Sequence, residues 1–103
     1  MNEIKNMDNP ILGLDNSFPE NLWLLELGGK HFCHTFEELN GVSCFENIKN
    51  ALEIKTLLAT QFPGIFVSNY TFDEAREIAK SKPNIQCLFL LDNPDNIKIH
   101  YIR

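Results

Sequence analysis

The side chains best suited to chemistry gather in one short stretch of the chain. Residues 28–36 read GGKHFCHTF and hold His31, Cys33 and His34, which are two of the three histidines and one of the three cysteines. Because cysteine and histidine are common zinc ligands, this spacing raises the question of a metal site. A β-strand, however, sends His31 and Cys33 to one face and His34 to the other. At most two ligands then converge, so we predict neither a metal site nor a cofactor here.

The three cysteines differ in how well their expected positions suit a reactive thiol. A cysteine nucleophile needs a base within hydrogen-bond reach, and the strand neighbours of Cys33 point away from it. Cys87, inside the apolar run IQCLFLL, is typical of a small buried hydrophobe. Cys44 is expected to open a helix, where the helix dipole lowers a thiol pKa. No catalytic residue is predicted, and the candidates for a ligand or reactive site are Glu26, His31, Cys33 and Cys44.

A hairpin is expected to position most of these residues. The apolar runs NLWLLEL and KHFCHTF flank a Gly-Gly pair, which suits a two-residue type I′ loop. Gly28 and Gly29 in the loop would place Glu26 opposite His31 and Trp23 opposite His34. Side chains alternate across a strand, so two faces result, and we predict that the first is the core face. The first face holds Trp23, Leu25, Leu27, Phe32, His34 and Phe36, and the second holds Leu22, Leu24, Glu26, His31, Cys33 and Thr35.

Two capping signals predict where helices begin. Ser43 with Glu46, and Thr71 with Glu74, both have the spacing of a capping box. The first predicts a helix over residues 44–62, and the second predicts a helix that ends before Pro83. Short apolar runs predict further strands. These strands cover residues 65–68, 85–91 and 97–102.

The expected order of elements is therefore β-β-α-β-α-β-β. This order predicts a small α+β domain with one mixed, mostly antiparallel sheet and two helices packed largely on one face. A chain of 103 residues fits one domain, which we assign to residues 22–103. Residues 1–21 contain turn residues and no apolar period, and they predict an arm that is partly ordered or draped over the domain.

Charge and composition exclude several classes of protein. The net charge is −5, and residues 1–50 carry eight acidic side chains against three lysines. No basic stripe is present, which argues against nucleic-acid binding. No apolar run is long enough to cross a membrane. The odd number of cysteines, without a C-x-x-C pair, indicates a reducing cytoplasm.

These features favour a small, cytoplasmic, non-enzymatic module for protein interaction or regulation. Its partner would be another protein or a second copy, and an edge strand or a helix face could join a homodimer. A small-molecule-binding domain or small enzyme, with a pocket near Glu26, His31 and Cys33, is the alternative. A third hypothesis is an acidic inhibitor of a nucleic-acid-binding protein, since an acidic half can meet a basic partner.

Overall fold

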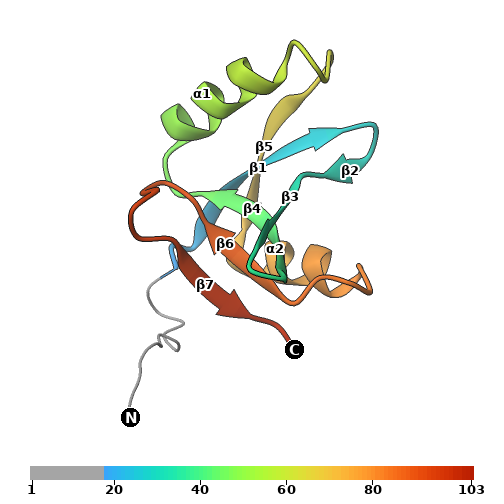
Figure 1. Cartoon of the computed structure of the whole chain (residues 1–103), viewed down its shortest axis with the longest axis vertical. Helices are drawn as coiled ribbons and strands as arrows, with labels where there is room; N and C mark the ends of the chain where they lie inside the picture. The colour runs from blue at the N-terminus through green and yellow to red at the C-terminus, as the bar shows by residue number, and fades with distance from the viewer. Residues whose placement is uncertain (1–17) are drawn as a thin grey trace.

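A computed structural model describes residues 18–103, so most of the predicted N-terminal arm of residues 1–21 lies outside the described residues. The described chain forms a small compact α+β domain with one seven-stranded sheet and two helices, which confirms the predicted fold class (Figure 1). The elements are β1 (Asn21–Leu27), β2 (Lys30–His31), β3 (Cys33–Phe36), β4 (Leu39–Phe45), α1 (Ile48–Leu58), β5 (Phe66–Thr71), α2 (Phe72–Lys80), β6 (Cys87–Leu90) and β7 (Lys98–Tyr101).

The main path of the sheet is β5-β1-β4-β6-β7. The short strands β2 and β3 extend it by pairing with β1 and β4, respectively. The pairing of β4 with β6 is parallel, and every other described pairing is antiparallel. The prediction of a mixed, mostly antiparallel sheet is therefore confirmed.

The Gly-Gly hairpin forms as predicted but is shorter than expected. Gly28 and Gly29 have φ angles of 59° and 79°, the left-handed values that a type I′ turn requires, and Glu26 pairs with His31. The hairpin ends at Phe32, whose N–H donates to the Leu25 carbonyl while its own carbonyl accepts from the N–H of Ser43. Phe32 is thus a corner at which the chain leaves β1 and joins β4.

This corner makes the predicted pair of Trp23 and His34 wrong. Trp23 lies opposite Phe45 of β4 and Asn69 of β5, and His34 lies opposite Gly41. The pairing between the two hairpin strands does not continue beyond Phe32, because the first residues of β1 pair with β4 on one side and with β5 on the other. Only the pairs closest to the glycines follow from the turn.

The two helices lie on opposite faces of the sheet, so the prediction that they share one face is wrong. Alternate residues of β1 enter separate cores: Leu22 and Leu24 pack with Ala75 and Ala79 of α2, whereas Leu25 packs with Ala51 of α1. β1 is apolar on both faces, and each face needs its own cover. The choice of one core face in the hairpin is wrong for the same reason.

Residues 39–45 form a strand that the sequence pattern does not predict. Ser43 is buried in β4, and α1 begins at Ile48 with Asn47 as its N-cap, accepting from the Lys49 N–H. The predicted Ser43 cap is therefore wrong, because β4 takes a central place between β1 and β6. At the start of α2 the predicted capping box of Thr71 and Glu74 is confirmed.

Candidate functional site

Two of the predicted site residues meet, and they are joined by a third that sequence reasoning missed. Glu26 of β1, His31 of β2 and Tyr70 of β5 form a polar network in which the Tyr70 hydroxyl donates to Glu26 Oε2. Nε2 of His31 lies 3.1 Å from the Tyr70 hydroxyl oxygen and 3.4 Å from Glu26 Oε2. Glu26 is 9% exposed, so its carboxylate depends on these partners.

Burial affects the protonation of His31 in this network. It lowers the pKa of His31 below 6.5, whereas nearby Glu26 acts to raise that pKa. The folded protein therefore binds the proton that charges the His31 imidazole less tightly than the unfolded chain does. The contribution of His31 to the free energy of unfolding is fully present above pH 6.5 and falls as the pH decreases below it. At neutral pH we expect a neutral imidazole.

The arrangement is suited to holding strands together. In the tautomer of His31 with its proton on Nε2, the imidazole can donate to Tyr70 while Tyr70 donates to Glu26, so each group satisfies the next. A surface pocket of about 400 Å³ lies beside Tyr70, and Glu26, His31 and Cys33 do not line it. The lining residues are Tyr70, Asp73, Glu74, Glu77 and Ile78.

The two candidate thiols lie apart from this network's polar atoms. Cys33 is exposed on β3, and its Sγ lies 3.6 Å from the backbone carbonyl of His31. Neighbouring residues nevertheless desolvate its thiol in part, which raises the pKa of Cys33, and Lys82 acts in the opposite direction. Cys44 lies in β4 and is fully buried, which raises its pKa far above the ordinary range. The prediction that Cys44 lies at the start of a helix, where the dipole would lower its pKa, is therefore wrong, because α1 begins at Ile48.

The thiol of Cys87 is buried, as its apolar sequence context indicates. Burial raises its pKa to about 12. A thiol that keeps its proton is a poor nucleophile, so this residue contributes packing to the sheet.

A cluster of aromatic rings lies on the other side of the sheet, away from α2. The ring centroids of His34 and Phe36 are 4.2 Å apart, and Phe36 meets Phe89 edge-on at 5.0 Å. Phe89 is fully buried beneath them, while His34 is exposed and Phe36 is half-buried. We call His34, Phe36 and Phe89 the aromatic face. The alternation of His34 and Phe36 along the chain indicates that their side chains share one face of a strand. The sequence did not predict β4, the strand that pairs with β3.

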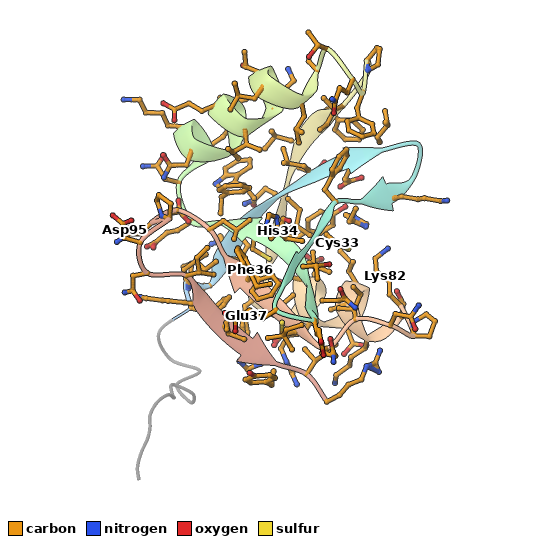
Figure 2. The ribbon with its side chains drawn as sticks, viewed as in Figure 1. Cys33, His34, Phe36, Glu37, Lys82 and Asp95 are labelled. Atoms are coloured by element: carbon orange, nitrogen blue, oxygen red, sulfur yellow. The ribbon has the colours of Figure 1, made fainter. Side chains whose placement is uncertain are left out.

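Helix α1 does not reach this part of the sheet. It packs over β1, β5 and β4, and within residues 18–103 no helix lies in front of β6 and β7 in this view (Figure 1). The β3–β4 turn at one end of the aromatic face consists of Glu37 and Glu38, both exposed and both with positive φ. Figure 2 shows Glu37 following Phe36, with Asp95 away from them in the loop that joins β6 to β7.

Comparison of the chain with protein-family models, with curated proteins and with solved structures gave no match. The site must therefore be interpreted from its own geometry. Among the described residues no cluster of three or more His, Cys, Asp or Glu side chains could hold a metal ion. No helix of residues 18–103 is both long and apolar enough to cross a membrane.

The proton of Tyr70 provides a test of the polar network. Burial and the hydrogen bond to Glu26 raise the pKa of Tyr70 from 10.0 to about 12. Stability from this phenol is therefore present below pH 10.0 and is lost as the pH rises towards about 12. We expect Glu26→Gln to lower the pKa of Tyr70, because it removes the charge that opposes a phenolate. Tyrosinate absorbance measures this, with Tyr70→Phe as the reference, and an unchanged midpoint would contradict the network.

Proposed function

We propose that the chain is a small, non-enzymatic protein-interaction module that docks a basic protein surface on its aromatic face. The observation that carries this proposal is the pair of rings of His34 and Phe36, over which no helix of residues 18–103 lies. Helix α2 covers one face of the sheet, whereas α1 covers only part of the other. A docking partner would supply the missing layer.

The rings have the character of an interface centre. Aromatic side chains are enriched at such centres because they bury a large area with little loss of rotamer entropy. The rings of His34 and Phe36 contact each other and pack against the buried ring of Phe89, so they are already ordered before a partner binds. Preorganised contacts of this kind reduce the entropy lost on binding.

The charges around the aromatic face favour a basic partner. Glu37 and Glu38 lie at one end, and Asp95 with Glu46 lies towards the other, all of them exposed. The chain as a whole carries −5. An arginine can stack its guanidinium on a ring and donate two hydrogen bonds to a carboxylate, which suits this combination. Two copies meeting through the same acidic surface would repel each other.

Selection from a random-peptide display library tests the proposal. We expect the selected peptides to be enriched in arginine or lysine together with apolar residues, and their binding to weaken as salt rises. The double variant His34→Ser, Phe36→Ser should lose at least about tenfold in affinity, since truncation of central anchors costs more than about 1.4 kcal/mol.

The matched control is Leu57→Ser, which removes another exposed apolar side chain (73% exposed) from the far end of α1. It should bind the selected peptides as the wild type does. The proposal is contradicted if the peptides show no basic enrichment, or if the double variant folds normally and binds them with unchanged affinity.

A further inference from the structure

Strand β5 ends the sheet on the side opposite β7, and its outer edge has no strand partner among the described residues. The direction of its backbone groups follows from the ladder with β1. The N–H of Phe72 donates to the carbonyl of Glu20, and these two residues continue the register in which Thr71 pairs with Asn21. Hydrogen-bonded pairs alternate in an antiparallel ladder, so even-numbered residues of β5 bond to β1 and odd-numbered residues point outward.

Two other hydrogen bonds agree with this assignment. The carbonyl of Leu25, an odd-numbered residue of β1, accepts from Phe32 on the side away from β5. The N–H of Thr71 also points outward, and it is occupied by the Glu74 carboxylate of the capping box. The N–H and carbonyl groups of Val67 and Asn69 are therefore the ones that a further strand would meet.

We infer that β5 pairs with β5 of a second copy of this chain, antiparallel and about a two-fold axis at Ser68. The outward groups of Val67 then exchange both backbone hydrogen bonds with the partner subunit's Asn69, and symmetry repeats the exchange. Ser68 faces the partner subunit's Ser68 as a non-hydrogen-bonded pair, with Cα atoms about 4.5 Å apart.

The side chains of β5 suit this self-pairing. Phe66 is 46% exposed and shares a face of the strand with Tyr70. In the inferred register Phe66 lies opposite the partner subunit's Tyr70, and cross-strand aromatic pairs of this kind are stabilising. The small Ser68 side chains leave room at the axis, so no bulky group separates the two backbones.

Charge favours a second copy over an unrelated partner at this edge. Residues 66–71 (FVSNYT) carry no formal charge, although the chain as a whole carries −5. Edges of sheets are usually protected by lysine, proline or a bulge, and β5 has none of these within residues 66–71. Within residues 66–71 no like charges therefore lie opposite each other when the strand meets its own copy, at a site separate from the acidic aromatic face. One strand edge buries little area, so we expect a weak, concentration-dependent dimer.

Disulfide cross-linking tests the register directly. In a Cys33→Ser background, which removes the exposed native thiol, Ser68→Cys should form a covalent dimer in oxidised glutathione, because the paired Cα atoms lie within disulfide range. Asn69→Cys is the matched control. It lies opposite the partner subunit's Val67 and too far from its own symmetry mate, so it should remain monomeric on non-reducing gels. Equal cross-linking of both variants, or none with Ser68→Cys, would overturn the inference.

The native edge is tested without cross-linking by light scattering over a wide range of protein concentrations. The wild type should shift towards a dimer as concentration rises. Asn69→Pro removes an outward N–H and the side-chain hydrogen bond to the Leu22 carbonyl, but none of the backbone bonds between β5 and β1. Phe66→Ser removes the aromatic contact. Both variants should remain folded when dilute and stay monomeric when concentrated. A strictly monomeric wild type, or a dimer that survives in Phe66→Ser and in folded Asn69→Pro, rules out this interface.

Discussion

Phe89→Ala is expected to lower the free energy of unfolding by about 3–5 kcal/mol. Phe89 lies in β6, is fully buried, and supports the rings of His34 and Phe36. Removing its ring leaves a cavity that the parallel β4–β6 pairing cannot close. Because the typical domain is stable by only about 5–15 kcal/mol, this loss is severe.

Urea unfolding followed by the fluorescence of Trp23, the single tryptophan, measures this effect. Phe89→Leu keeps most of the volume and should cost much less than Phe89→Ala. Leu57→Ala on the exposed surface of α1 should change stability by no more than about 0.5 kcal/mol. A stability loss in Phe89→Ala as small as that of Leu57→Ala would show that the core does not depend on this ring.

Gly41→Ala is expected to destabilise the protein by about 1–3 kcal/mol, as overpacked core substitutions do. A Cβ at Gly41 would lie 2.6 Å from Cδ2 of Phe89 and 2.8 Å from Sγ of Cys87. Both neighbours are fully buried and have little room to move. Gly41 is therefore required by the close approach of the Phe89 ring to the backbone of β4.

A double-mutant cycle distinguishes this cause from a general cost of replacing glycine. In a Phe89→Leu background, Gly41→Ala should cost less than in the wild type, with a coupling of at least about 0.5 kcal/mol. Gly28→Asn is the second comparison. Nothing lies within 4 Å of a Cβ at Gly28, and asparagine tolerates its φ of +59°, so stability should change little. Purely additive costs in the cycle would argue against the steric explanation.

Local signals in the sequence predicted the elements that depend on neighbouring residues. The Gly28-Gly29 turn needs only two residues with positive φ, and the capping box of Thr71 and Glu74 needs only four consecutive residues. The apolar run around Cys87 likewise predicts a covered strand, since both of its faces are apolar. Each of these features is decided within a few residues, where steric preference and hydrogen bonding act directly.

The capping signal at Ser43 shows where local reasoning fails. Ser43 and Glu46 have suitable spacing, yet Ser43 is drawn into β4, while Asp92 from the β6–β7 loop accepts from the N–H groups of Glu46 and Asn47. A residue almost fifty positions away thus sets the boundary between β4 and α1. Long-range pairing of this kind overrides a weak local preference.

The polar network of Glu26, His31 and Tyr70 also combines one contact set by a local turn with one set by long-range strand pairing. The turn at Gly28-Gly29 brings Glu26 opposite His31, so half of the network could be predicted from the sequence. Tyr70 reaches Glu26 from β5, a strand whose pairing with β1 no local pattern indicates.

The sequence by itself therefore determined an α+β domain, its hairpin turn, the start of α2 and the pairing of Glu26 with His31. Tertiary structure alone decided that the helices take opposite faces, that β4 exists, and that His34 stacks on Phe36 instead of approaching Trp23. The physical reason is that turns and caps form from adjacent backbone groups. The cover of a sheet face depends on which apolar surfaces remain exposed after every strand has been paired.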